Sequence, residues 1–346
     1  MDKSWKKILL FVLLGMLAIA SAGCVGGEEA EHPDEINFGI LRVPNDETIA
    51  IAEGLFDKYF AEEGIKYNLR VFDSGAEANQ ALASGEIDFA HMGNTNAITA
   101  KSRELGVEMI WIHEVLGEIE ALAVKEDSDI NEVEDLAGEK IAVPFASTSH
   151  YILLNVLKEA GIEEEVELLD MKTAEVVAAW ERGDIKAAYV WQPSLGKILE
   201  TGRVLVSSAD MIEEGYITAN VEVVRKEFSE KYPGQVVSYI ACMKEAADIY
   251  REDPQEAAAI VADELEISED EALLQMQGSN KYTPEELLGD DFFGTSEEAG
   301  QFAEIMKDTS DFLQEQDSID NSPSREEYNK YVNPEYIERY LDEYSE

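Results

Sequence analysis

Hydroxyl side chains cluster at one point of the chain, where a predicted strand gives way to a predicted helix. Ser147, Thr148, Ser149 and His150 follow an apolar run and open an amphipathic stretch. The first N–H groups of a helix lack partners within the helix, and the helix dipole adds partial positive charge there. We therefore expect a compact anion, such as a carboxylate, sulfonate or phosphate, to bind here. His150 either adds a donor or is an ordinary residue of the helix surface.

Two more polar pairs open predicted helices in the same way. Ser74 precedes Gly75, and Asn94 precedes Thr95. Any one such pair is also an ordinary helix cap. The functional prediction depends on their convergence, which would let several helix N-termini hold one oxyanion without an arginine.

A second set of residues suits a positively charged group. Glu118 and Glu120 come just before one predicted strand, Asn220 takes the matching place before another, and Trp191 directly follows a third. A carboxylate near an aromatic face favours an ammonium group through charge and ring quadrupole. Together with the anion site, these residues predict a site for a small zwitterion. The alternative is that the two acids are solvated loop charges and the tryptophan belongs to the core.

The common signatures of catalysis are missing from the sequence. The four histidines never fall four residues apart, and neither a CxxC pair, a GxSxG elbow nor a GxxxxGK[ST] phosphate loop occurs. Cys242 lies in an apolar helical pattern and reads as a small buried hydrophobe. The sequence therefore predicts a binding protein without metal or cofactor, and not an enzyme.

Short apolar strands that alternate with amphipathic helices must position these residues. The pattern predicts an α/β fold with parallel sheets flanked by helices. The predicted strands are 36–43, 68–72, 87–90, 109–112, 140–143, 166–169 and 187–190.

The two halves of this pattern resemble each other at an offset near 100 residues. Val43-Pro44 and Val143-Pro144 each end a strand, and Gly85 and Gly183 each follow a helix and precede a strand. A third match pairs the strands 121–126 and 221–226. We therefore expect two α/β lobes joined by two crossing strands, which form a hinge and point their strand ends into one cleft.

The N-terminus has the layout of a secretory signal. Lysines precede an apolar run at 8–20, and small residues follow it. The run is shorter than the roughly 18 to 20 residues that span a bilayer. Cys24 comes next and begins a polar stretch, so we expect it to carry a lipid anchor, although Ser21 stands where such signals usually have leucine.

The charge balance is strongly acidic. The chain of 346 residues has 74 Asp and Glu against 27 Lys and Arg, a formal net charge of -47. This charge opposes binding to nucleic acid. Because it is spread without a distinct acidic tail, it favours a solvated surface adapted to concentrated salt, as in a halophile.

The sequence resembles the taurine-binding proteins of ABC importers, within the wider aliphatic-sulfonate, nitrate and thiamine-precursor binding family. The resemblance runs from about Ile36 to Phe228 and rests on a set of short segments: 72–75, 81–85, 141–145, 147–150, 178–185, 189–191 and 223–226. It implies a two-lobed type II periplasmic-binding fold that delivers its ligand to a membrane permease powered by a separate ATPase.

One departure bears on the ligand. The resemblance implies an Asp that holds an ammonium group where this chain has Asn220, and Glu222 replaces an aromatic residue. Glu118 could restore the charge from the opposite crossing. Taurine is the first choice of ligand, and another small anion such as an alkanesulfonate or nitrate is the second. An enzyme like the related pyrimidine synthases is a further alternative, but its histidine and cysteine would have to lie in the cleft.

The expected organisation follows from these assignments. Residues 1–23 form the signal peptide and 24–35 a linker; 36–119 with 220–346 form lobe I, and 120–219 form lobe II. We expect a monomer outside the cytoplasmic membrane, held there by the lipid anchor or free in the periplasm, that docks on its permease.

Overall fold

Ten strands form two five-stranded sheets in the computed structural model, which describes residues 32–344. Sheet A has the order β2 (Lys66–Phe72), β1 (Glu35–Leu41), β3 (Phe89–Gly93), β10 (Ala219–Arg225) and β4 (Val107–Val115). Sheet B has the order β7 (Glu167–Asp170), β6 (Lys140–Val143), β8 (Ala187–Trp191), β5 (Glu120–Lys125) and β9 (Gly202–Ser207). The two sheets thus share one topology, as the sequence repeat predicts.

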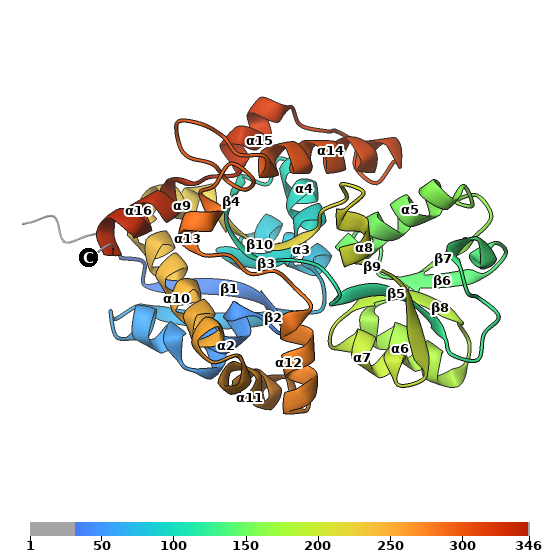
Figure 1. The fold of residues 1–346 in the computed structure, drawn as a ribbon. Coiled ribbons are helices and arrows are strands. Elements are labelled where there is room, and N and C mark those ends of the chain that lie inside the picture. The colour runs from blue at the N-terminus through green and yellow to red at the C-terminus, as the bar shows by residue number, and fades with distance from the viewer. Residues whose placement is uncertain (1–31, 345–346) are drawn as a thin grey trace, which may run out of the picture. The chain divides into compact units, whose positions relative to one another are not determined.

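One strand in each sheet runs against its neighbours. β10 pairs antiparallel with β3 and β4, and β5 pairs antiparallel with β8 and β9. These are the two strands that the repeat identified as crossings. β5 follows β4 directly into sheet B, and β10 brings the chain back into sheet A (Figure 1). We call sheet A with its helices lobe I and sheet B with its helices lobe II.

Helices cover both sheets and extend lobe I at its C-terminal end. Between the strands of sheet A lie α2 (Asp46–Ala52), the π-helix η1 (Asp57–Ala61), α3 (Gly75–Ser84) and α4 (Asn94–Ser102). Sheet B carries the 3-10 helix η2 (Val133–Leu136), α5 (Thr148–Ala160), α6 (Thr173–Arg182), α7 (Ser194–Leu199) and α8 (Ser208–Ile212). After β10 follow α9 (Lys226–Lys231), α10 (Pro233–Glu252), α11 (Pro254–Leu265), α12 (Glu269–Gln277), α13 (Pro284–Leu287), α14 (Phe302–Glu315), α15 (Arg325–Tyr331) and α16 (Glu335–Tyr344).

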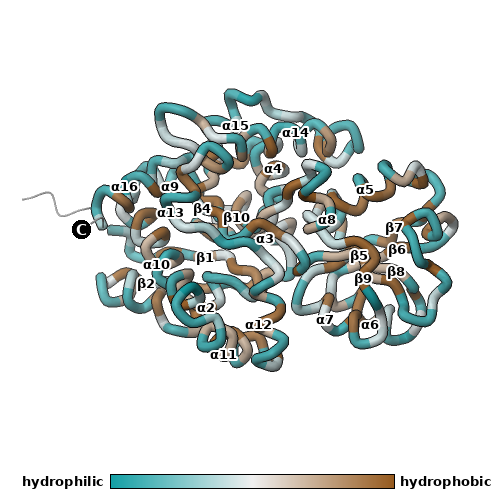
Figure 2. Tube along the Cα trace, viewed as in Figure 1, coloured by the Kyte–Doolittle hydropathy of each residue, from teal (hydrophilic) through white to brown (hydrophobic). Residues whose placement is uncertain are grey.

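Hydrophobic side chains fill the space between sheets and helices. In lobe I, Phe38 packs on Phe56, Phe89 and Tyr239 with ring centroids 5.0 to 5.8 Å apart. Trp180 is buried in lobe II. Figure 2 shows hydrophobic residues along the strands of both sheets and hydrophilic residues on the outer turns. Cys242 is buried, as predicted for a small core residue.

The glycines of the repeat have the conformation that a helix cap requires. Gly85 ends α3 with φ 74°, and Gly183 ends α6 with φ 77°. Only glycine adopts this left-handed backbone at little cost. Both halves therefore use the same device to turn from a helix into a buried strand.

Several strand ends differ from the prediction. β3 continues to Gly93 instead of ending at Ala90, and β4 continues to Val115 instead of Ile112. β10 pairs with both strands and extends them. His91 and Glu114 therefore lie within strands, where the sequence pattern placed them in loops. The pattern also does not predict β9, a half-exposed edge strand.

Helix α14, in the C-terminal part of the chain, contacts lobe II. Phe312 packs edge-on against Tyr151 of α5 with ring centroids 5.5 Å apart, and Lys158 Nζ lies 5.1 Å from the Phe312 ring. Among the described helices, none is long and apolar enough to cross a membrane. The predicted signal peptide and Cys24 lie outside the described residues.

Candidate functional site

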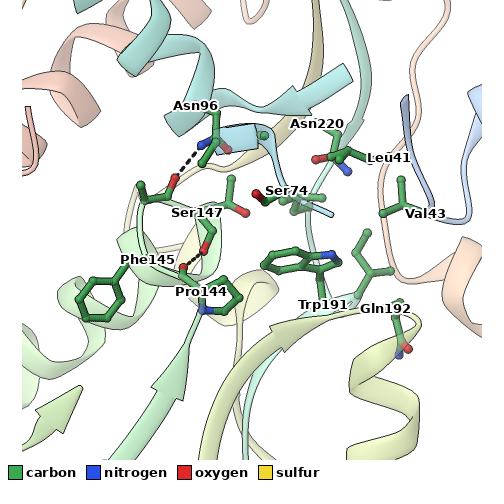
Figure 3. Close-up of a pocket in the computed structure, with 17 residues that line it drawn as sticks. Leu41, Val43, Ser74, Asn96, Pro144, Phe145, Ser147, Trp191, Gln192 and Asn220 are labelled. Carbon is green, nitrogen blue, oxygen red and sulfur yellow. Dashed lines mark hydrogen bonds between the residues drawn. The ribbon is translucent and has the colours of Figure 1, made fainter. Parts of the chain in front are cut away.

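A cavity with about 40 Å³ of space accessible to water lies between the two sheets, where their strands end (Figure 3). Lobe I contributes residues at or after the ends of β1, β2 and β3 and one residue of β10, lobe II contributes residues at or after the ends of β6 and β8, and the segment between β4 and β5 contributes two more. The lining residues are Leu41, Val43, Ser74, Gly75, Ala76, Gly93, Asn96, Leu116, Ile119, Pro144, Phe145, Ala146, Ser147, Thr148, Trp191, Gln192 and Asn220. This is the position in which ligands bind to open α/β sheets.

Half of the residues predicted for the site line this cavity. Those that line it are Ser74, Gly75, Ser147, Thr148, Trp191 and Asn220. Those that do not are Asn94, Thr95, Glu118, Glu120, Ser149 and His150. The site was predicted from helix starts that converge on one cleft, and this convergence is present. The side chains that line the cleft are only partly those that were predicted.

The hydroxyls at the start of α5 are engaged within the protein. Ser147 caps the helix, because its Oγ accepts the His150 N–H at 3.1 Å and donates to the Pro144 carbonyl at 2.6 Å. Thr148 and Ser149 donate to Glu120 at 2.5 and 2.6 Å. The hydroxyl protons that we expected to hold an anion are therefore already used. Because the His150 N–H is bound by the Ser147 cap, the backbone donor that remains at the cavity wall is the N–H of Thr148.

A second helix start faces the same cavity from lobe I. Ser74 caps α3 and lines the cavity with Gly75 and Ala76, the first two residues of the helix. A Cβ on Gly75 would come within 2.5 Å of Asn96 Oδ1, so no larger residue fits without a shift. Asn96 in turn donates from Nδ2 to the Ala146 carbonyl of lobe II at 2.8 Å. The starts of α3 and α5 thus lie on opposite walls of one cavity.

The turn before α5 has an uncommon backbone. Ala146 adopts φ 58°, a left-handed conformation that residues other than glycine rarely take. Its N–H is directed to His150 Nδ1 at 3.4 Å, and the His150 ring stacks on Phe145 with centroids 4.5 Å apart. Burial lowers the pKa of His150 to about 4, so the imidazole is neutral at pH 7. His150 therefore supports the turn and does not offer a charge to the ligand.

Glu120 lies behind the residues with which lobe II lines the cavity and does not itself line it. Its side chain is fully buried and accepts hydrogen bonds from Thr148, Ser149, Ser208 and Thr218. Burial raises the pKa of Glu120, and the hydroxyl donors act in the opposite direction. The carboxylate thus fixes the start of α5 from below. Glu118 is exposed and does not line the cavity.

Two residues at one helix start of lobe I, that of α4, also differ from the expectation. Asn94 is fully buried, and its Oδ1 accepts the Ala219 N–H of β10 at 3.3 Å. Thr95 is buried beside it. Asn94 therefore joins α4 to sheet A, and Gly93 and Asn96 line the cavity at this helix start instead.

Comparison with known proteins identifies the family of this chain. The family model described as NMT1/THI5 like matches residues 50–257. The chain belongs to the NMT1/THI5-like family.

Relatives within and around this family show the same length and fold. The taurine-binding periplasmic protein of Escherichia coli (strain K12) is 33% identical over 84% of this chain and 88% of its own length. A putative aliphatic sulfonates-binding protein of Bacillus subtilis (strain 168) is 26% identical over 90% of this chain and 94% of its own. The solved alkanesulfonate-binding protein of Xanthomonas axonopodis pv. citri has a TM-score of 0.71 at 17% identity, covering 86% of this chain and 96% of that one. The predicted family and the two-lobed periplasmic-binding fold are therefore confirmed.

In this NMT1/THI5-like chain, an acid that the sequence analysis passed over touches the cavity wall. Asn220 donates from Nδ2 to Glu114 Oε1 at 2.6 Å, and Asn45 Nδ2 lies 3.4 Å from the same oxygen. Glu114 is buried in β4, and burial raises its pKa. No local sequence signal marks it, because its contact with Asn220 depends on the register between β4 and β10.

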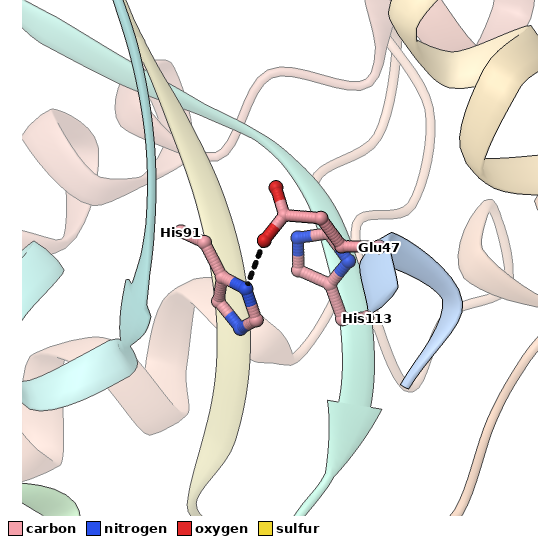
Figure 4. A group of neighbouring side chains, drawn as sticks. All are labelled: Glu47, His91 and His113. Carbon is pink, nitrogen blue, oxygen red and sulfur yellow. Dashed lines mark hydrogen bonds and ion pairs between the residues drawn. The ribbon is translucent and has the colours of Figure 1, made fainter. Parts of the chain in front are cut away.

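A buried group of ionisable residues lies further inside lobe I (Figure 4). The ligand atoms of Glu47, His91 and His113 all lie within 4.8 Å of one another, so this donor set could hold a metal ion. Histidines on two strands separated by β10 gave no such signal in the sequence. His91 Nδ1 lies 2.7 Å from Glu47 Oε2, and the two nitrogens of His113 face Asp46 and Glu222 at 2.7 and 3.2 Å.

These contacts indicate protons shared among acids and imidazoles. Asn45 Oδ1 accepts the Thr48 N–H as the cap of α2, which directs its Nδ2 toward His91 Nε2 at 3.5 Å. The ring of His91 thus has Glu47 beside Nδ1 and Asn45 beside Nε2. Burial acts to lower the pKa of His113, but Asp46 and Glu222 at its two nitrogens raise it well above 6.5, so the ring is held as an imidazolium. The ring nitrogens thus already have hydrogen-bonding partners.

Proposed function

We propose that this chain is the extracytoplasmic receptor of an ABC importer, and that it captures a small sulfonate between its two lobes without catalysing a reaction. Taurine is the first choice of ligand. The named functions of the relatives support this assignment, because the taurine-binding protein of Escherichia coli matches most of both chains.

The observation that carries the proposal is the pair of helix starts on facing walls of the cavity. α3 presents the N–H groups of Gly75 and Ala76, and α5 presents that of Thr148. Each helix end favours an anion by roughly 0.3 to 1 kcal/mol when exposed, and by up to about 2 kcal/mol when partly buried. The cavity lining includes no lysine or arginine. A tetrahedral oxyanion with three acceptor oxygens can use donors from both lobes at once.

The rest of the cavity suits the short apolar part of such a ligand. Leu41, Val43, Leu116, Ile119 and Trp191 form apolar walls around the polar end (Figure 3). Small-ligand sites are usually apolar with a few fixed polar groups. A carbon chain of two atoms, as in taurine, places its second polar group near the opposite end of the cavity.

Calorimetric titration of the chain from Cys24 onward tests the function. We expect taurine, ethanesulfonate or isethionate to release heat with a single site per chain, and nitrate and glycine betaine to serve as comparisons. If no sulfonate binds at millimolar concentration, the proposed function is wrong. If nitrate alone binds, the site is an anion receptor of another class.

The location outside the membrane is part of the same proposal. Cys24 would carry a lipid anchor after removal of residues 1–23, and the protein would act as a monomer beside its permease. Residues 36–119 and 220–346 would move as lobe I and 120–219 as lobe II. Mass spectrometry of the membrane-extracted protein checks the modification, and Cys24→Ser should release the protein into the soluble fraction.

A further inference from the structure

A close contact between the two lobes lies in the wall of the cavity. Gly93 ends β3 of lobe I, Thr148 opens α5 of lobe II, and both residues line the cavity. A Cβ added to Gly93 would lie 2.7 Å from Thr148 Cγ2. Carbon atoms in contact are normally about 3.5 to 4.0 Å apart, so the two lobes meet here without room for another methyl group.

Lobe I by itself does not require glycine at position 93. The residue has φ -66° and ψ 149°, an extended backbone that any amino acid adopts. Of the three atoms nearest to the added Cβ, only Asn96 Oδ1 belongs to lobe I, and it lies at an ordinary contact distance of 3.6 Å. The other two are Cγ2 and Oγ1 of Thr148. The missing side chain at Gly93 therefore makes room for lobe II.

The methyl group of Thr148 is held in place. Its Oγ1 donates to Glu120 Oε1 at 2.5 Å, and three further hydroxyl groups donate to the same buried carboxylate. Because a threonine carries Oγ1 and Cγ2 on one stiff carbon centre, fixing the hydroxyl also fixes the direction of the methyl group. Glu120 thus keeps Thr148 Cγ2 pointed at Gly93.

The same contact sets the distance between the backbone donors of the two lobes. The N–H of Thr148 belongs to the wall of lobe II, and the N–H groups of Gly75 and Ala76 belong to the facing wall of lobe I. Hydrogen bonds from N–H to oxygen are about 2.7 to 3.2 Å long. One oxyanion can therefore use donors from both walls only if the lobes come close together.

The cavity that remains between these walls is small. It has about 40 Å³ of space accessible to water, and one water molecule needs roughly 10 to 15 Å³ of such space. The closed lobes therefore hold a ligand of few atoms, and a longer carbon chain requires the walls to move apart.

We propose that the contact between Gly93 and Thr148 limits how closely the lobes approach, and that this limit selects sulfonates with a short carbon chain. The inference rests on the proposed function and names the ligand class within it. A methyl group at position 93 would overlap Thr148 Cγ2 by about 1 Å and would keep the lobes apart by a similar distance.

Gly93→Ala tests the contact with two sulfonates that differ only in chain length. Separating the walls breaks hydrogen bonds from one of them, so G93A should bind ethanesulfonate about tenfold or more weakly than the wild type. Butanesulfonate fits the closed cavity poorly and should lose less, so the preference for ethanesulfonate should fall. Calorimetric titration measures both affinities. The melting temperature without ligand should stay unchanged, because the new methyl group has room in lobe I.

A second substitution should reverse the effect. Thr148→Ser removes Cγ2 and keeps both the hydroxyl group for Glu120 and the backbone N–H. The double variant G93A/T148S should therefore bind ethanesulfonate as the wild type does and regain the preference for it. A defect of G93A within lobe I alone would not be repaired by a change in lobe II.

Gly234→Ala is the matched control. Gly234 lies in the first turn of α10, outside the cavity lining, and no atom lies within 4 Å of a Cβ added there. G234A should bind both sulfonates like the wild type.

The outcomes separate this contact from the proposed function. If neither sulfonate binds the wild-type protein, the proposed function is wrong, and the selectivity inferred from it is wrong as well. If the wild type binds ethanesulfonate and G93A binds it equally well, or if G93A/T148S does not recover, the limiting contact is wrong while the sulfonate receptor stands. Equal losses for the two sulfonates in G93A would show that the contact does not select by chain length, which also overturns the proposal.

Discussion

At the scale of single residues, the contrast between a hydroxyl and a backbone N–H decides how an anion is held. The hydroxyls of Ser147, Thr148 and Ser149 bond protein acceptors, and the His150 N–H bonds Ser147 Oγ, which leaves the N–H groups of Thr148 and Ser149 at the start of α5. We therefore expect the sulfonate to depend on the backbone donors, and only indirectly on the side chains around them.

A pair of variants at Thr148 tests this dependence. Thr148 is the first residue of α5, a position where proline fits a helix, and Ser147 before it has the extended backbone that proline requires. Thr148→Pro removes the N–H and the hydroxyl, whereas Thr148→Ala removes the hydroxyl alone. A hydrogen bond to a charged group contributes roughly 1.5 to 3 kcal/mol, so T148P should bind a sulfonate at least about tenfold more weakly than T148A. Equal affinities, with both melting temperatures preserved, would place the anion elsewhere.

The sequence allowed the cavity wall to be predicted at Ser74, Gly75, Ser147, Thr148, Trp191 and Asn220, because each lies at a strand end or a helix start, or in the case of Asn220 at the beginning of a strand. It did not allow the partner of each side chain to be predicted. Glu120 and Thr148 are 28 residues apart, and Asn220 and Glu114 are 106 apart. Such pairs depend on strand register and helix position, which local patterns do not determine. Glu120 was therefore predicted to bind the ligand, whereas in the structure it supports the start of α5 by accepting hydrogen bonds from its hydroxyl groups.

At the scale of elements, strand β10 joins lobe I's buried charges to one another. Glu222 of β10 faces His113 of β4, and α2 adds Asp46 on the other side of the same imidazole. The repeat predicted β10 as a crossing strand. The alternation of Val221 and Val223 also predicted a strand. It did not predict which residue Glu222, the acid between them, would contact.

This arrangement predicts that stability falls as the pH rises from 7 to 8.5. Burial raises the pKa of Glu222 to about 8. Burial acts to lower the pKa of His113, but Asp46 and Glu222 raise it well above its ordinary value of 6.5. Both groups thus bind protons more tightly in the folded than in the unfolded chain, so folding is favoured below the folded-state pKa and loses this contribution above it.

Urea unfolding at pH 7 and at pH 8.5 measures the effect. Surface carboxylates are ionised throughout this range, and His150, with a pKa near 4, is neutral in the folded state at both values. Glu222→Gln removes one of the two groups and should make the free energy of unfolding less dependent on pH. A wild-type protein that is equally stable at both values would show that this cluster takes up no extra proton on folding.

At the scale of the whole molecule, polar contacts beside the cavity join the two lobes, in addition to the packing of α14 on α5. Lys172 of lobe II, the cap residue of α6, donates to Glu77 Oε1 of α3 at 2.6 Å and lies 3.8 Å from Asp73. The Asn96 bond to the Ala146 carbonyl is the second contact. Domain closure commonly traps ligands in such folds. Since both contacts bridge the two lobes, they stabilise the arrangement in which the lobes are closed.

Removing the lysine should speed ligand release. Surface ion pairs contribute about 0.2 to 1 kcal/mol, so Lys172→Met should raise the dissociation rate of a bound sulfonate by roughly two- to fivefold. Lys140 is 56% exposed and pairs with Glu167 within lobe II, which makes Lys140→Met the matched control. Stopped-flow release measures both variants. Equal rates for K172M and the wild type would mean that the pair across the cleft does not hold the lobes closed.

The net charge of -47 acts on the same molecule over longer distances. Like charges repel across the surface of the folded protein, and the repulsion reaches farther as salt is removed, because the Debye length grows from about 8 Å at 0.15 M to about 30 Å at 0.01 M. The free energy of unfolding should therefore be lower at 0.01 M salt than at 0.15 M. The ion pair between Lys172 and Glu77 responds in the opposite direction, since salt weakens attraction as well.

Melting temperatures of wild type and K172M, measured together at both concentrations, separate the surface repulsion from the ion pair. Both proteins should melt lower at 0.01 M, with the loss slightly larger in K172M. A wild-type melting temperature that does not change with salt would remove the argument that this surface is adapted to concentrated salt.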